Sequence, residues 1–125
     1  MRERVEEMAG YCDTEVLLEI VGGKWKLLIV KYLLRGTHRF NALQRALPPI
    51  TQRMLTRQLR ELEADGLVAR TVYPEVPPRV EYALTDVGRS LGPLVAQLDH
   101  WGHWYREHLR TRAEAQEQVP PARSR

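Results

Sequence analysis

Residues 51–84 read TQRMLTRQLRELEADGLVARTVYPEVPPRVEYAL, and the first part of this stretch has the pattern of one amphipathic helix. Thr51 is a residue type that caps helix N-termini. Leu55, Leu59 and Leu62 then recur at spacings of four and three, which places them on one helical face. The pattern stops at Asp65-Gly66, and we therefore predict a helix over residues 51–65.

The other face of this helix carries guanidinium and polar groups. Acidic residues follow only in its last turns, so positive charge is concentrated towards its N-terminus, where the helix dipole also favours phosphate. The fork of an arginine side chain can pair with two acceptor atoms of guanine or of a phosphate. We predict that this face binds DNA through Thr51, Gln52, Arg53, Thr56, Arg57 and Arg60.

The second part of the stretch changes to a period of two, which is typical of strands. Residues 68–73 and 80–84 alternate in this way, and Pro74, Pro77 and Pro78 separate them. The pattern predicts a β-hairpin over residues 68–84 with a stiff loop. Because Arg79 lies at the end of that loop, we expect it to contact the DNA backbone or the minor groove.

Three shorter helical patterns precede this stretch. The first begins at Asp13 or Thr14 and stops before Gly22, the second spans residues 24–35, and the third follows Asn41. Three helices, a polar-faced fourth helix and a two-stranded ribbon in that order are typical of a winged helix-turn-helix. The predicted fold class is mainly α with a small β-hairpin (α+β).

A heptad-like apolar seam follows the hairpin. It begins after Thr85 and continues past Gly92-Pro93, which must kink the helix or split it in two. This seam and the apolar stripe of the first helix exceed what a monomer of this size covers, so we predict a homodimer joined through its terminal helices. The predicted interface residues are Val16, Leu17, Ile20, Leu91, Leu94, Leu98, Trp101 and Tyr105.

Length and pattern predict one folded domain with an extension at each end. The chain has 125 residues, enough to bury one core without a metal or a disulfide. We expect residues 1–12 to form an N-terminal arm and residues 13–109 to form the winged helix-turn-helix with its dimerisation helices. Residues 110–125 are polar, and we predict that this tail is disordered.

Charge is segregated along the chain in a way that favours a polyanionic partner. The net charge is only +3, but residues 24–60 contain nine Lys or Arg and no Asp or Glu. The single cysteine excludes an intrachain disulfide, and no apolar run predicts a signal peptide or a membrane span. We therefore expect a cytoplasmic protein that binds double-stranded DNA and no membrane.

The segment from Gly22 to Val95 resembles the HxlR-type transcriptional regulators, relatives of the MarR-type winged-helix proteins. Its most characteristic parts are Gly23-Lys24-Trp25, Arg39-Phe40, residues 55–70 and residues 73–85. The resemblance, which spans Cys12 to about Trp101, implies a homodimeric, cytoplasmic DNA-binding repressor or activator of bacterial type. The two-fold axis of such a dimer predicts a near-palindromic operator. We add Arg39 to the predicted DNA-binding residues.

Cys12 lies where the resemblance places an N-terminal cysteine that, in some HxlR-type proteins, senses electrophiles or oxidants. The start of a helix favours a thiolate, whereas the neighbouring Asp13 and Glu15 oppose it. A lone cysteine is more often a small buried apolar residue. Cys12 is therefore a candidate redox sensor, with a small electrophile or oxidant as its reaction partner.

The sequence also offers weaker alternatives. His100 and His103 have a spacing that can bind zinc, but no cysteine joins them, and we expect no metal site. No nucleophile with a base and no glycine-rich phosphate loop can be read, so we expect neither an enzyme nor a cofactor. The alternative function is a non-specific architectural DNA-binding protein, which would spread its basic charge over the whole surface.

Overall fold

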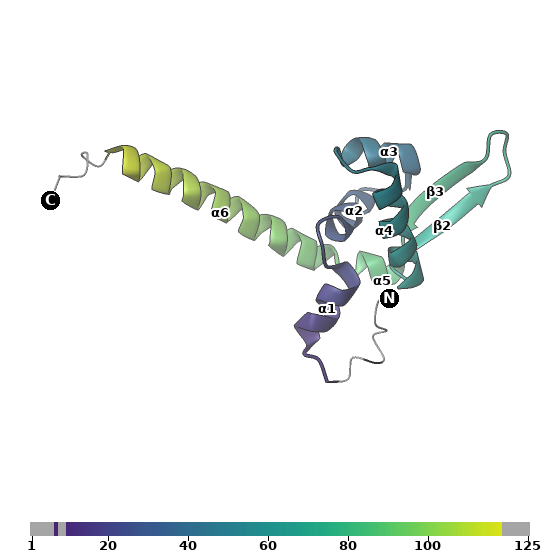
Figure 1. The fold of residues 1–125 in the computed structure, drawn as a ribbon, viewed down its shortest axis with the longest axis horizontal. Coiled ribbons are helices and arrows are strands. Elements are labelled where there is room, and N and C mark those ends of the chain that lie inside the picture. The colour runs from purple at the N-terminus through teal and green to yellow at the C-terminus, as the bar shows by residue number, and fades with distance from the viewer. Residues whose placement is uncertain (1–6, 8–9, 119–125) are drawn as a thin grey trace. The chain divides into compact units, whose positions relative to one another are not determined.

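The computed structural model describes Glu7 and residues 10–118, and it contains the helices and the hairpin expected from the sequence (Figure 1). The chain divides into two units, residues 1–92 and 93–125, which are described separately. The helices are α1 (Asp13–Val21), α2 (Lys26–Leu33), α3 (Phe40–Ala46), α4 (Gln52–Ala64), α5 (Asp86–Arg89) and α6 (Gly92–Gln118). The strands are β1 (His38–Arg39), β2 (Val68–Tyr73) and β3 (Arg79–Leu84).

The leucine face of α4 is buried in the core of the first unit. Leu55, Leu59 and Leu62 are at most 1% exposed, which confirms the apolar face predicted for this helix. α4 contacts α2 and β2, while α2 also contacts α3 and β3. Each fully buried leucine contributes about 1.5–3 kcal/mol relative to an exposed one, so this packing fixes the helix with its other face outward.

The sheet has three strands, and this corrects the two-stranded ribbon of the sequence analysis. The strand order is β1-β3-β2, with both pairings antiparallel. β1 pairs His38 with Tyr82 and Arg39 with Glu81. Two residues are too few to show a period of two, so pairing with β3 rather than a sequence pattern defines this strand. β1 leads directly into α3, and Arg39 rather than Asn41 is therefore the N-cap of that helix.

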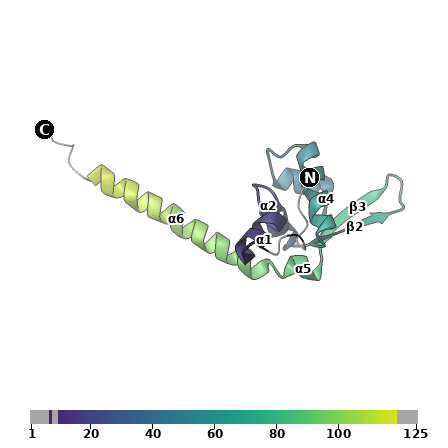
Figure 2. The same cartoon turned by 60° about the horizontal axis from the view of Figure 1, so that its bottom comes forward.

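The turns around α4 and the hairpin follow the predicted chemistry. The hydroxyl oxygen of Thr51 accepts a hydrogen bond from the Met54 N–H at 3.0 Å, which confirms the predicted cap. The chain leaves α4 through Gly66, whose φ of +79° lies in the left-handed region that favours glycine. The hairpin of β2 and β3 then projects beyond the helices of this unit (Figure 2).

The C-terminal helical region is split in two, as the sequence predicted. α5 ends at Arg89, and α6 begins at Gly92, so that Pro93 occupies the first turn, where its missing N–H costs no intrahelical hydrogen bond. α6 continues past Leu109 to Gln118, which corrects the prediction of disorder for residues 110–118, and the rest of the predicted tail, residues 119–125, lies outside the described residues. Ion pairs one turn apart support this extension, because Arg110 contacts Glu107 at 2.8 Å and Glu114 at 2.7 Å.

The base of the hairpin is tied to α5 by close backbone packing. Thr85 caps α5 by accepting from the Gly88 N–H at 3.1 Å, and its hydroxyl donates to the Gly66 carbonyl. Gly88 is buried, and a Cβ at this position would lie 2.2 Å from the Leu67 carbonyl oxygen. Only glycine fits this contact without moving backbone.

We therefore expect Gly88→Ala to lower the free energy of unfolding by about 1–3 kcal/mol, because the added methyl group overpacks the junction. Gly102→Ala is the matched control, since a Cβ at Gly102 meets no heavy atom within 4 Å and alanine is the better helix former. Denaturant unfolding at one protein concentration measures both changes. Equal transition midpoints for the two variants would contradict the role of the Leu67 contact.

Candidate nucleic-acid interface

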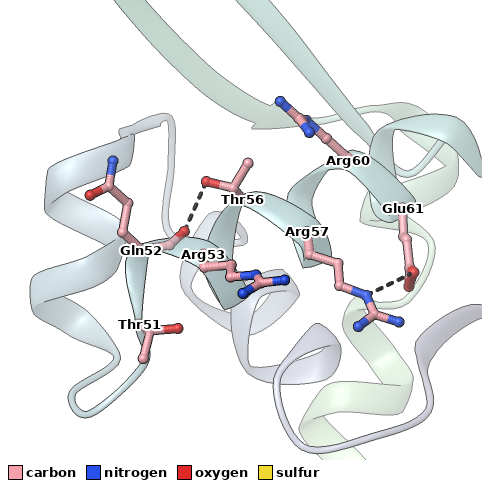
Figure 3. A pocket seen from close by; sticks show the side chains of 7 residues that line it. All are labelled: Thr51, Gln52, Arg53, Thr56, Arg57, Arg60 and Glu61. Carbon is pink, nitrogen blue, oxygen red and sulfur yellow. Dashed lines mark hydrogen bonds and ion pairs between the residues drawn. The ribbon is translucent and has the colours of Figure 1, made fainter.

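The outward face of α4 forms a polar hollow on the surface of the first unit. It has a volume of about 780 Å³, and all six DNA-binding residues predicted on this helix line it (Figure 3). Its lining consists of Thr51, Gln52, Arg53, Thr56, Arg57, Arg60 and Glu61. The buried leucines on the opposite face position these side chains, so the helix is amphipathic in the sense that the sequence predicted.

The arginines of the hollow differ in their surroundings. Arg60 extends towards the strands, whereas Arg57 extends towards Glu61, one turn further along the helix (Figure 3). The Arg57 Nε lies 3.8 Å from a Glu61 carboxylate oxygen. Thr56 turns its hydroxyl to its own helix and donates to the Gln52 carbonyl at 2.8 Å. The guanidinium groups are therefore the main donors that this face presents to a ligand.

Glu61 is a residue of the hollow that the sequence analysis did not identify. Its carboxylate also accepts from Lys26 of α2, with an Nζ–Oε1 distance of 2.7 Å. The Lys26 side chain is only 5% exposed, so one of the nine bases counted in residues 24–60 points into the protein. The spacing of four residues between Arg57 and Glu61 could have predicted their ion pair. No sequence pattern links Glu61 to Lys26.

A second, smaller cavity lies between α4 and the sheet. It measures about 160 Å³, and Arg60 lines it together with Arg70 and Tyr82. Arg70 is paired with Glu63 at 3.5 Å. Burial raises the pKa of Tyr82 above its ordinary value, with the nearby Arg70 opposing the shift. The sequence analysis placed Arg70 and Tyr82 in strands and assigned them no role.

Arg79 is engaged within the hairpin. Its guanidinium carbon lies 3.9 Å from the centroid of the Tyr73 ring, and its nitrogens lie 3.4 Å from Glu75 and 3.8 Å from Glu81. Residues 68–84 contain two arginines and two glutamates, so their net charge is zero. This arrangement favours a bracing role for Arg79, and a DNA contact by this residue stays a prediction.

Arg39 lies apart from the hollow. It is exposed on β1, opposite Glu81 of β3, and it does not line either cavity of α4. The structure therefore brings together the six predicted residues of α4 but does not bring Arg39 or Arg79 into the same hollow. A DNA contact by Arg39 also stays a prediction.

Some of the predicted dimer residues line an apolar cavity between α1 and α5. Val16, Leu17 and Ile20 of α1 face Leu91 and Val87 across a volume of about 300 Å³. α1 lies beside α5 in both views of the fold (Figures 1 and 2). The structure thus brings the first stripe and the start of the seam together within the first unit.

The second unit carries the rest of the seam on α6. Leu98, Trp101 and Tyr105 are exposed, and Leu94 is partly exposed. The Trp101 and Tyr105 rings stack with centroids 5.2 Å apart. Two exposed residues that the sequence analysis did not include extend this apolar surface, namely Trp104 and Leu109.

Cys12 is exposed and is the N-cap of α1. Its backbone N–H donates to the Glu15 carboxylate at 3.3 Å, half of a capping box. The alternative that Cys12 is a buried apolar residue is therefore wrong for the chain as described. The exposed position makes the thiol accessible to a solute.

Within Glu7 and residues 10–118, no three His, Cys, Asp or Glu side chains are grouped as metal ligands. His108 instead stacks on Trp104 with ring centroids 5.3 Å apart. Over the same part of the chain, no helix has both the length and the apolar character that a membrane span requires.

The chain is similar to known regulators over most of its length. The family described as HxlR-like helix-turn-helix matches residues 20–110. The HTH-type transcriptional regulator YybR of Bacillus subtilis is 53% identical over 98 residues, which cover 78% of each chain. The redox regulator HypR in its oxidized form is 54% identical with a TM-score of 0.71, covering 74% of this chain and 95% of HypR.

A MarR-family transcriptional regulator from Enterococcus faecalis V583 is also similar, with 45% identity and a TM-score of 0.68. The match covers 78% of this chain and 89% of that protein. The family match spans the hollow of α4, the hairpin and most of α6. The chain therefore belongs to the HxlR-like helix-turn-helix family of transcriptional regulators.

Proposed function

We propose that this regulator reads the sequence of double-stranded operator DNA with the outward face of α4. The observation that carries the proposal is the hollow lined by Arg53, Arg57 and Arg60 on a helix anchored by buried leucines. A helix of about 10–12 Å diameter fits the major groove, where arginine pairs with guanine O6 and N7. The rigid backing supports base reading, because a base contact needs a fixed geometry.

The hairpin serves as the wing beside this helix. It projects from the same unit as α4, and wings of this kind reach the adjacent DNA backbone or minor groove (Figure 2). Because residues 68–84 have no net charge, the wing contributes little to the general attraction for phosphate. We propose that Arg79 and Arg39 add backbone contacts at the edges of the interface formed by α4.

The alternative is a non-specific architectural DNA-binding protein. Such a protein needs phosphate contacts from many directions and no fixed reading face. Here the bases are concentrated in residues 24–60, and the last part of the chain, residues 61–125, carries a net charge of −2. This distribution favours a single reading face on each protomer. We propose that the protein acts on DNA in the cytoplasm.

The DNA proposal is tested by selecting binding sites from random duplexes and then measuring affinities at one salt concentration. We expect Arg53→Ala and Arg57→Ala each to cost about 1–3 kcal/mol on the selected site and to reduce its preference over random DNA. Arg79→Ala is the comparison, since loss of a phosphate contact weakens both duplexes equally and lowers the salt slope by about one. A wild-type protein that binds both duplexes equally would contradict sequence reading.

We further propose that the protein acts as a symmetric homodimer. The apolar residues exposed on α6 and the apolar cavity between α1 and α5 support this proposal, since exposed apolar patches of this kind mark protein interfaces. A two-fold axis would place two reading helices about 34–36 Å apart, one turn of DNA. The operator would then be a near-palindrome with that spacing between half-sites.

For the dimer, we expect Leu98→Asp and Trp101→Ala to shift the protein towards monomer and to weaken operator binding. The charge or the cavity would disrupt the apolar seam, and large aromatic residues are common anchors of interfaces. Light scattering at micromolar concentration measures the mass. A wild-type mass of 14.5 kDa would contradict the homodimer.

A response to oxidants or electrophiles through Cys12 is a second proposed property. The exposed thiol at the start of α1 favours it, and a similar protein of known structure is described as a redox regulator. The chain has one cysteine, so the products are a sulfenic acid, an adduct, or a disulfide to another molecule. Modification next to α1 would then act on the proposed dimer interface.

We expect a peroxide or a quinone to release operator DNA from the wild-type protein and to leave the Cys12→Ser complex intact. A mobility-shift titration with each reagent measures the release, and mass spectrometry identifies the product on Cys12. Reversal by a thiol reductant would distinguish a sulfenic acid or a disulfide from a stable adduct. A wild-type complex that survives both reagents would rule out this response.

A further inference from the structure

We propose that the ion pair between the buried Lys26 and the half-buried Glu61 positions Arg57 for base reading and thereby helps to set the DNA specificity of α4. This inference rests on the proposed function. It assigns Lys26 and Glu61 a positioning role, in which neither residue itself needs to contact DNA. Glu61 lies in the hollow and contacts both side chains, with Lys26 at 2.7 Å and Arg57 at 3.8 Å.

The burial of Lys26 makes this pair different from a surface ion pair. Its side chain is 5% exposed and that of Glu61 is 29% exposed, whereas Arg57 is 71% exposed. An exposed arginine paired with a mobile carboxylate gains little, because both side chains lose conformational freedom. Lys26 already holds the Glu61 carboxylate in place, so Arg57 meets a fixed partner and only its own freedom is lost.

The geometry leaves Arg57 able to bind a base. Glu61 lies on the Nε side of the guanidinium, and the terminal nitrogens extend beyond this contact (Figure 3). Two terminal N–H groups are what a guanine O6 and N7 pair requires. A side chain that is oriented before binding loses less conformational entropy when it binds. It also discriminates between bases more sharply than a side chain that can turn to a phosphate instead.

The test uses the full-length protein and the site selected with the wild type. Glu61→Gln alone leaves Lys26 buried without its charge partner, which can unfold the chain. The informative variant is therefore Lys26→Met with Glu61→Gln, which removes both charges and keeps the side-chain volumes similar. Thermal unfolding shows whether its fold is retained before any DNA is added.

We expect the double variant to lose about 10-fold or more of its preference for the selected site over random duplex, with the loss confined to one base pair in each half-site. Arg57→Ala should then cost less than about 2-fold further in that background, although it costs 10-fold or more in the wild type. Arg53→Ala is the control, and its cost should be the same in both backgrounds.

An equal cost of Arg57→Ala in both backgrounds would overturn the positioning role and leave the ion pair purely structural. A double variant that melts like the wild type and keeps every base preference would also overturn it. A wild-type protein that selects no sequence would instead contradict the proposed function itself. The two failures are therefore distinguished by the first selection experiment.

Discussion

Burial of the α4 leucines is the constraint on which the outward surface of this helix depends. Leu55, Leu59 and Leu62 hold one side of the helix in the core, so the opposite side faces solvent. Because the packed helix cannot turn about its own axis, its arginines cannot move to carboxylates elsewhere in the protein. The proposed sequence reading requires a fixed helix face, and that face follows from apolar packing rather than from the arginines themselves.

Much of this fold was predictable because local signals and long-range packing agree. The caps at Thr51 and Thr85, the leucine stripe and the change of period after Gly66 all act within a few residues, where sequence patterns are informative. β1 escaped prediction because two residues carry no pattern. The end of α6 was misjudged because ion pairs one turn apart, such as those of Arg110, outweighed a polar composition.

The candidate site was predictable in its residues and less so in their pairings. All six α4 residues line one hollow, as helical spacing indicated. Helical spacing does not predict which charges are neutralised by residues elsewhere in the fold, however. The two pairings that the sequence did not predict are both of this type. Lys26 is buried against Glu61, although it belongs to the basic block, and Arg79 lies against Tyr73 and two carboxylates. Counting bases in a sequence therefore overstates the charge available to DNA.

Under the proposed function, the neutrality of the hairpin has a kinetic consequence for the search for one operator among random DNA. Each phosphate contact made on random DNA strengthens non-specific binding. Stronger non-specific binding slows sliding and hopping along the duplex. A hairpin in which two glutamates balance two arginines adds no more than the contact proposed for Arg79, so it slows this search little. On this proposal, α4 supplies most of the attraction to random DNA while the protein searches for its operator.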